Sequence, residues 1–231
     1  MKRSEINAIL SDGQQFIQKM GFYLPPFAYW TVEQWSQQGE DAREIIENGL
    51  GWDITDFGSG DYSRTGLLLF TVRNGSAKEM QARLGKLYCE KAMIAGVGQL
   101  TPMHFHHNKV EDIINRGGGR LIVKLYNSND CAELATSDVT VTLDGIERTV
   151  GAGSELTLKP GESITLRPGL YHSFWGKDDP VLVGEVSLVN DDVSDNFFLT
   201  PIGRFPRIEE DESPQRLLVS DYSRHYQIDR K

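Results

Sequence analysis

The first hydrophobic pattern along the chain has the spacing of a helix. Apolar residues from Ile6 to Met20 recur mostly at intervals of three and four, after Ser4 as a cap and before a glycine and two prolines. A second helical stretch is expected from Thr31 to about Asn48, where glycines follow. The spacing therefore predicts a helical extension over residues 1–64.

Beyond the extension the pattern changes to short apolar runs separated by turn residues. Asp144 and Gly145 form the dipeptide that a two-residue hairpin turn favours. Strand-like runs follow one another without a regular alternation with helices, which favours an antiparallel sandwich or small barrel over a parallel sheet. The runs are "LLLFTVRNG", "LYCEKAMIAGVG", "RLIVKLYNSND", "VTVTLDGIERTV", "ELTLKPGESITLRPG" and "VLVGEVSLV".

These patterns predict one mainly β domain over residues 1–231. We expect its barrel core to span residues 65–200 and to carry the functional site. The remaining residues, 201–231, are expected to form a tail that packs on the barrel, with one further strand near Leu217–Tyr222.

The composition of the chain disfavours two classes of binding partner. The formal charge of −9 and the lack of a basic patch disfavour nucleic acid and anionic membrane surfaces. The first residues lack an apolar stretch typical of a signal peptide, so we expect a cytoplasmic protein. Cys89 and Cys131 are too few for a disulfide framework and are expected to be reduced thiols.

The segment "PMHFHHNKVED" is the first candidate for chemistry. Because side chains alternate along a strand, His104 and His106 would share one face and His107 would point the other way. Glu111 can return towards this pair after a turn, and His172, much later in the chain, can be aimed at the same cavity. Three imidazoles and a carboxylate suit a divalent first-row metal and leave coordination positions open. The alternative is that these are surface or core histidines without a ligand.

The spacing around these histidines resembles the first motif of the cupin superfamily. Residues 98–118 read G(x)5HxH(x)4E(x)6G, and "GESITLRPGLYHSFWG" approaches the second cupin motif. In that second motif Arg167 stands where the family has proline, and Gly176 stands where it has asparagine. The resemblance implies a cupin-type β-barrel, or jelly roll, and a metal held by four ligands. The implied ligands are His104, His106, Glu111 and His172, with Asp112 as the alternative to Glu111, while His107 and His225 are left as packing or surface residues.

Within the cupins, the sequence resembles the metal-dependent D-lyxose isomerases. The likeness is carried by "HFHHNKVEDIINRGGG", "GEVSLVNDD" and "SDNFF" and is densest over residues 88–205. It implies interconversion of D-lyxose with D-xylulose and of D-mannose with D-fructose, a Mn²⁺-type ion (with Co²⁺, Fe²⁺, Ni²⁺ or Zn²⁺ as alternatives) and a homodimer.

Moving a proton between C2 and C1 of a sugar requires a base and a donor to the oxygens. Glu185 is the candidate base, because it lies on a mostly apolar strand where burial would raise its pKa. Lys109 is expected to donate to a sugar oxygen, and Asp195 to orient hydroxyls or share a proton relay. Lys91 and Arg204 are the candidate substrate-binding residues.

Three alternatives stay open from the sequence. A hydride shift would use the same metal without a base. A cupin oxygenase or oxidase uses a similar ligand set and would consume oxygen, and a sugar-binding cupin would bind without turnover.

Overall fold

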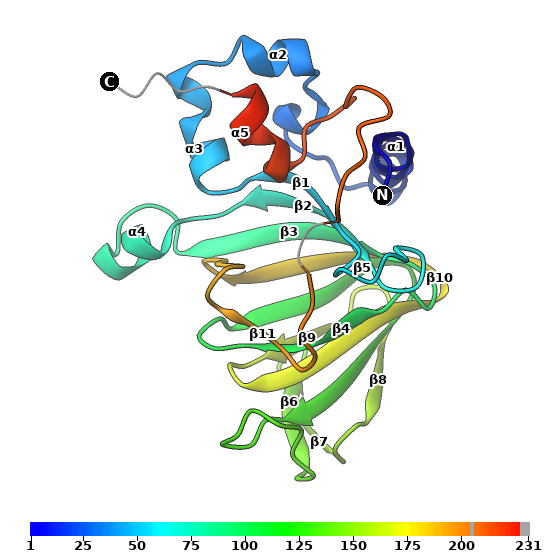
Figure 1. Cartoon of the computed structure of the whole chain (residues 1–231). Helices are drawn as coiled ribbons and strands as arrows, with labels where there is room; N and C mark the ends of the chain where they lie inside the picture. The colour runs from blue at the N-terminus through cyan, green and yellow to red at the C-terminus, as the bar shows by residue number, and fades with distance from the viewer. Residues whose placement is uncertain (204–205, 227–231) are drawn as a thin grey trace.

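A computed structural model describes residues 1–203 and 206–226. Most helices gather on one side of a large antiparallel sheet, one short helix projects from its edge, and the far end of the sheet curls into a barrel (Figure 1). The helices are α1 (Arg3–Lys19), α2 (Val32–Ser36), α3 (Arg43–Glu47), α4 (Ala77–Ala82) and α5 (Tyr222–His225), with the 3-10 turns η1 (Pro26–Tyr29), η2 (Glu40–Ala42) and η3 (Val219–Asp221). The strands are β1 (Gly51–Thr55), β2 (Leu67–Arg73), β3 (Tyr88–Ala95), β4 (Thr101–His106), β5 (Glu111–Asn127), β6 (Val139–Leu143), β7 (Ile146–Val150), β8 (Glu155–Leu158), β9 (Ser163–Leu166), β10 (Leu170–Leu188) and β11 (Asn196–Phe198).

Two long strands organise the sheet. Its main path runs β1-β2-β3-β10-β5-β9-β6-β7, and β4 branches from β10 while β8 branches from β5. β10 pairs with β4 through its first half and with β3 through its second half. Its register shifts between Lys177 and Val181, so the ladder against β5 is interrupted there. The mainly β, cupin-like fold predicted from the sequence is therefore confirmed.

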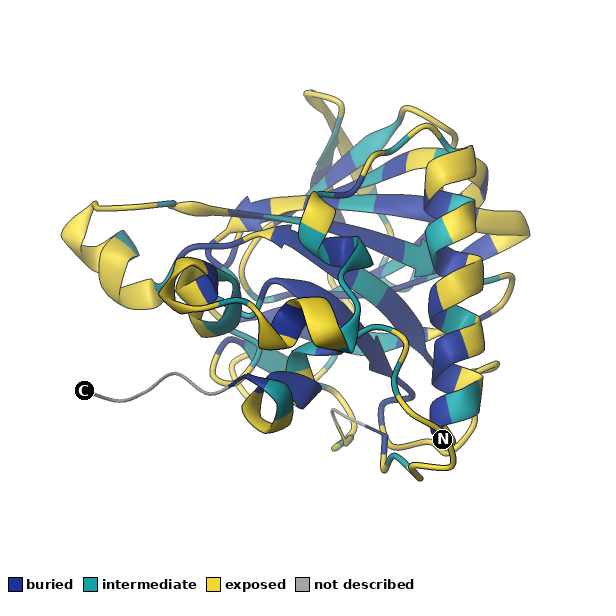
Figure 2. Cartoon of the chain, turned by 90° about the horizontal axis from the view of Figure 1, so that it is seen from above, coloured by how far each residue is buried: buried dark blue, intermediate teal, exposed yellow. Residues whose placement is uncertain are grey.

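Alternation along β2 divides the apolar core in two. Leu67 and Leu69 face the barrel interior, whereas Leu68 and Phe70 face the helical layer. Figure 2 shows the buried stripe of α1 turned towards this outer sheet face. Ile6 on α1 is fully buried there, and burial of such a side chain stabilises the fold by about 1.5–3 kcal/mol.

The two ends of the chain are joined by a buried ion cluster. The Arg3 guanidinium is fully buried and donates to Asp221 at 2.8 and 2.9 Å and to Glu210 at 2.8 Å. We call Arg3, Glu210 and Asp221 the Arg3 cluster. It ties α1 to the segment that follows the barrel.

Three local predictions need correction. The helix expected over Thr31–Asn48 is broken into α2, η2 and α3, because Gly39 interrupts it. The expected helical extension also contains β1, which pairs with β2 and is buried at every position. The strand expected near Leu217–Tyr222 is wrong, since this segment forms η3 and the start of α5 and keeps only an isolated bridge from Leu218 to Trp52.

The hairpin prediction is confirmed. β6 and β7 pair around Asp144 and Gly145, whose φ angles of 48° and 83° are those of a primed turn. Both cysteines are free thiols, Cys89 buried and Cys131 exposed.

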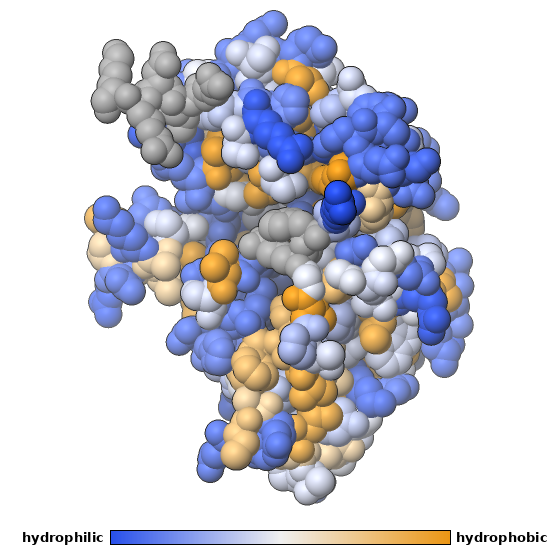
Figure 3. Space-filling model, viewed as in Figure 1, coloured by the Kyte–Doolittle hydropathy of each residue, from blue (hydrophilic) through white to orange (hydrophobic). Residues whose placement is uncertain are grey.

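One face of the surface can be judged by its hydropathy. On the face seen in Figure 3, hydrophilic residues cover most of the area and apolar residues form separate patches. Among the described helices, none combines the length and apolar character needed to cross a membrane.

Candidate active site

A cavity of about 210 Å³ lies inside the barrel. Aromatic side chains, among them Phe57, Phe174 and Phe198, form part of its wall. The rest of the wall carries buried ionisable groups from β3, β4, β5 and β10. Cavities of this kind, mostly apolar with a few converging polar groups, are typical of small-molecule sites.

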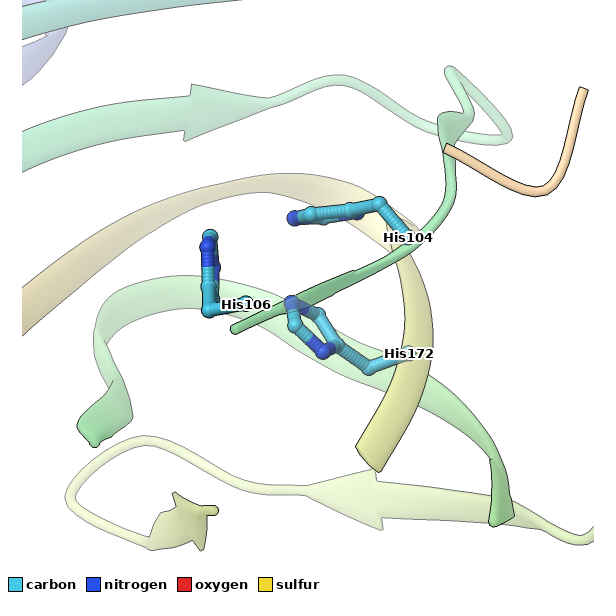
Figure 4. A group of neighbouring side chains, drawn as sticks. All are labelled: His104, His106 and His172. Carbon is cyan, nitrogen blue, oxygen red and sulfur yellow. The ribbon is translucent and has the colours of Figure 1, made fainter. Parts of the chain in front are cut away.

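Three histidines converge on this cavity from two paired strands. His104 and His106 alternate on β4 as predicted, and the β4–β10 register places His172 directly opposite His104. Their imidazoles point towards one another, and one ligand nitrogen from each lies within 4.8 Å of the others (Figure 4). All three are buried.

Backbone hydrogen bonds set the tautomers of two of these rings. The Nδ1 groups of His104 and His172 donate to the carbonyls of Pro102 and Leu170, at 2.8 and 3.0 Å. The Nε2 lone pairs are then free to bind a metal, which is the usual way a protein orients imidazole ligands.

Two of the buried imidazole nitrogens, His106 Nδ1 and His172 Nε2, have no hydrogen-bond partner in the described part of the chain. Burying a polar atom without a partner costs about 1–3 kcal/mol, and a metal ion would remove that cost for a nitrogen that faces it. The histidine group therefore fits a divalent ion.

Glu111 lies beside the histidine group. Its Oε1 is 3.3 Å from His106 Nε2 and 3.1 Å from His172 Nε2, and its carboxylate is buried. Asp112, the alternative, does not line the cavity and accepts a hydrogen bond from Thr165 Oγ1 at 2.6 Å. The geometry thus favours Glu111 as the fourth ligand.

Burial and neighbouring charges set the protonation of this group. Burial, together with the two neighbouring imidazoles, holds the pKa of His104 well below its ordinary value. Burial also lowers the pKa of His106. Burial would raise the pKa of Glu111, but Lys109 and His106 hold it well below its usual range. Neutral imidazoles and an ionised carboxylate are the forms that bind metals.

A chain of buried charges continues from Glu111 along the cavity wall. Lys109 Nζ donates to Glu111 Oε2 and to Glu185 Oε1, both at 2.8 Å. Lys91 Nζ lies 3.2 Å from the Glu185 carboxylate, because Lys91 and Glu185 are cross-strand partners on β3 and β10. Ser187, on the same strand face, donates to Glu185 Oε1 at 3.1 Å. We call Glu111, Lys109, Glu185 and Lys91 the lysine–glutamate chain.

The expected rise in the pKa of Glu185 is wrong. Burial alone would raise this pKa, but the ammonium groups of Lys109 and Lys91 lower it. The pKa of Lys109 is raised, because Glu111 and Glu185 outweigh the effect of burial. The pKa of Lys91 is raised for the same reason by Glu185. Glu185 is therefore ionised at neutral pH and able to accept a proton.

Asp195, expected to contact the sugar, is placed differently. Asp195 does not line the cavity, and its carboxylate accepts from the backbone amides of Asn108 and Lys109 at 2.7 and 3.1 Å. It therefore holds the turn that carries Lys109, which differs from the sugar contact expected. Arg204, the second expected substrate-binding residue, lies outside the described residues.

The remaining histidines lie away from the cavity. His107 is exposed in the bend that directly follows β4, with its ring against Phe105 and Phe197. His225 lies on α5.

Sequence reasoning missed several polar residues of the cavity wall: Asp53, Thr55, Thr101, Asp192 and Asn196. Asp53 and Thr55 lie two positions apart on β1, so their side chains share one strand face. Their segment was expected to be helix or loop, and nothing in the local pattern indicated that they line a cavity. Asp192 and Asn196 lie in the acidic cluster after β10, where polarity alone also fitted a solvated turn.

The fold is a cupin-type barrel with a candidate metal site in its cavity, and the comparisons with known proteins identify the family as one of sugar isomerases. The family model described as D-lyxose isomerase matches residues 1–222. A protein of Serratia proteamaculans named D-lyxose/D-mannose isomerase is 52% identical over 227 residues, covering 97% of this chain and 99% of its own. One of the same name from Escherichia coli O157:H7 is 52% identical over 225 residues, covering 96% and 98%. The chain belongs to the D-lyxose isomerase family.

A solved structure supports the fold. Ligand-free L-ribose isomerase of Cellulomonas parahominis aligns with a TM-score of 0.56 and 17% identity, over 90% of this chain and 98% of its own. At this identity the likeness concerns the fold alone.

Proposed function

We propose that this protein is a metal-dependent aldose–ketose isomerase that interconverts D-lyxose with D-xylulose and D-mannose with D-fructose. The observation that carries the proposal is the lysine–glutamate chain, which lies beside the histidine group on one cavity wall. The names of the relatives supply the sugars. D-Lyxose and D-mannose share their configuration at C2, C3 and C4, so recognition of that end of the sugar would accept both.

His104, His106, Glu111 and His172 would hold the metal. When bound, a divalent ion such as Mn²⁺, or Co²⁺, Fe²⁺, Ni²⁺ or Zn²⁺ in its place, supplies Lewis-acid polarisation of the sugar carbonyl. The donor set suits any of these ions, since imidazole and carboxylate ligands are shared among them.

Proton transfer would fall to the lysine–glutamate chain. Glu185, ionised by its two lysines, accepts the C2 proton of the aldose and returns a proton to C1, while one proton passes from O2 to O1. Between the two transfers the substrate is an enediolate, whose negative charge the Lys109 ammonium stabilises and to whose oxygen it can donate. Asp195 supports this step indirectly, by fixing the backbone of Lys109.

The charge balance of the cavity favours this assignment. Two buried ammoniums offset two buried carboxylates within the lysine–glutamate chain itself, and Asp53 and Asp192 add carboxyl groups elsewhere on the wall. A divalent cation beside Lys109 would concentrate positive charge next to the place where an enediolate develops, which favours such an anion over a neutral apolar substrate. An oxygenase or oxidase would gain less from this arrangement.

The test is an anaerobic incubation of the metal-loaded protein with D-lyxose and with D-mannose in D₂O. We expect ketose to form from both, with deuterium at C1, because a proton held by Glu185 exchanges with solvent. Ketose without deuterium would favour a hydride shift over proton transfer. No ketose from either sugar, with metal bound, would contradict the proposal, and oxygen consumption in air would then favour an oxidoreductase.

We also retain, as proposals, a homodimeric assembly and a cytoplasmic location. The resemblance to the family supports the first, and the composition of the chain supports the second.

A further inference from the structure

Asn190, in the segment "GEVSLVNDD", contacts both lysines of the lysine–glutamate chain. Its Oδ1 accepts from Lys91 Nζ at 2.7 Å and lies 3.4 Å from Lys109 Nζ. Asn190 is not part of the cavity wall. The hydrogen bonds of its side-chain oxygen to the two lysines are the direct link between Asn190 and the site.

Two further asparagines hold Asn190 in place. Asn74, which follows β2 and is buried, accepts from the Asn190 backbone amide at 3.0 Å and donates to its carbonyl at 3.1 Å. Asn74 also donates to the Asn48 carbonyl at 3.2 Å, and the Asn48 side chain donates back to the Asn74 carbonyl at 3.1 Å. These hydrogen bonds join three chain segments that are far apart in sequence. They fix the backbone from which the Asn190 side chain extends.

The distances indicate what the Asn190 oxygen does. Lys91 is closer to Asn190, at 2.7 Å, than to the Glu185 carboxylate, at 3.2 Å. A buried ammonium without this acceptor would move to the remaining anion, because a lost hydrogen bond to a charged group is costly in a low-dielectric site. Lys91 would then bond Glu185 tightly and reduce its ability to accept a proton.

The acceptor is also neutral, which matters for the charge balance. A carboxylate at position 190 would add a negative charge to those of Glu111, Glu185 and Asp192 and would draw Lys109 away from Glu111 and Glu185. An amide oxygen restrains Lys91 without changing the net charge of the site.

We propose that Asn190, fixed by Asn74, is a positioning residue that keeps Lys91 from closing on Glu185. The proposal rests on the proposed isomerisation, in which Glu185 must stay free to accept a proton. It assigns a part in the site to two asparagines that do not touch the cavity.

The first arm of the test is structural and independent of turnover. In a crystal structure of the Asn190→Ala variant with metal bound, we expect the hydrogen bond from Lys91 Nζ to Glu185 to shorten well below its present 3.2 Å. An unchanged Lys91 would overturn the proposal whether or not the protein isomerises sugars. Should Asn190→Ala not fold, Asn190→Ser serves in the same way, because its hydroxyl is too short to reach Lys91.

The second arm is kinetic. We expect Asn190→Ala to lower kcat for D-lyxose at least tenfold while KM changes less than threefold, and Asn74→Ala to lower kcat in the same way by a smaller factor. In a Lys91→Met background, Asn190→Ala should cost less than threefold, because the restrained group is gone. Equal losses in both backgrounds would overturn the proposal.

Asn48→Ala is the matched control. It removes the bond to the Asn74 carbonyl and leaves the two bonds between Asn74 and Asn190, so it should lower the melting temperature without a change in kcat. A kcat loss equal to that of Asn74→Ala would indicate a general structural effect and overturn the assignment. A wild-type protein without activity would contradict the proposed function. The crystal structure of Asn190→Ala would still show whether Lys91 moves towards Glu185.

Discussion

The Arg3 cluster and the lysine–glutamate chain are both ion networks built around a buried cation, but they differ in how completely their groups are satisfied. In the Arg3 cluster the guanidinium meets two carboxylates in paired hydrogen bonds, and none of its three residues lines the barrel cavity. The lysine–glutamate chain lines a cavity and lies beside imidazole nitrogens that lack partners.

The contrast separates stability from chemistry. Bidentate pairs between arginine and carboxylate are strong and geometrically fixed, which suits the joining of the two chain ends. Lysines between two carboxylates, with room beside them, can exchange partners when a substrate enters. The first network should therefore matter for folding and the second for turnover, and the following substitutions examine that division.

The largest effect is expected from a histidine of the metal group. His172→Ala should abolish stoichiometric metal binding and lower kcat/KM by roughly 10³-fold or more, because several kcal/mol of Lewis-acid stabilisation is lost. Elemental analysis and initial rates measure both quantities. His107→Ala, a change of the same type at an exposed position directly after β4, should alter neither.

The next effect concerns the proposed base. Glu185→Gln keeps the shape of the side chain but cannot accept the proton, so kcat should fall by about 10² to 10⁴-fold. Metal content should stay at one ion per chain. Glu155→Gln, on the exposed edge strand β8, is the control and should keep wild-type kcat. A Glu185→Gln variant with wild-type kcat would remove Glu185 from the mechanism.

Opening the Arg3 cluster should affect folding alone. Arg3→Ala leaves Asp221 buried without its partner and should lower the free energy of unfolding by about 3–5 kcal/mol, with kcat unchanged below the melting temperature. Denaturant titration and initial rates measure the two effects.

The loss of stability in Arg3→Ala should depend on pH. The hydrogen bonds from Arg3 lower the pKa of Glu210, so this pair stabilises the fold above the ordinary glutamate pKa, and the contribution is lost as pH falls through the lowered value. The stability difference between wild type and Arg3→Ala should shrink on acidification below about pH 4. A difference that grows there would contradict this assignment.

The smallest effect is expected at the surface. Arg120 and Asp178 form an ion pair at 2.6 Å, but both side chains are about half exposed, at 46% and 52%. Arg120→Ala should change the free energy of unfolding by less than about 1 kcal/mol, and less still at high salt. A loss as large as that of Arg3→Ala would show that burial does not explain the difference between the two pairs.

Local patterns sufficed for much of the fold and for the histidines. Alternation along β4 placed His104 and His106 on one face, and the Asp144–Gly145 turn marked its hairpin, because both depend on neighbours in sequence. Gly39 broke the expected helix over Thr31–Asn48, where apolar spacing alone had suggested continuity.

Contacts between segments that are distant in sequence could not be predicted. The direction of the Glu185 pKa depends on Lys91 and Lys109, which the strand register and the turn at Asp195 bring to it. The part of Asn190 depends on Asn74 in another loop. In each case the deciding quantity is a distance between side chains that no spacing along the chain encodes.

The register shift in β10 limits which deletions this enzyme can tolerate. His172 and Glu185 are thirteen positions apart, an odd number that would send them to opposite faces of an uninterrupted strand, yet both line the cavity. The interruption at residues 177–180 restores their common side. Loss of a single residue from this exposed stretch would turn either His172 or Glu185 outward, so its length is as constrained as the two cavity residues it separates.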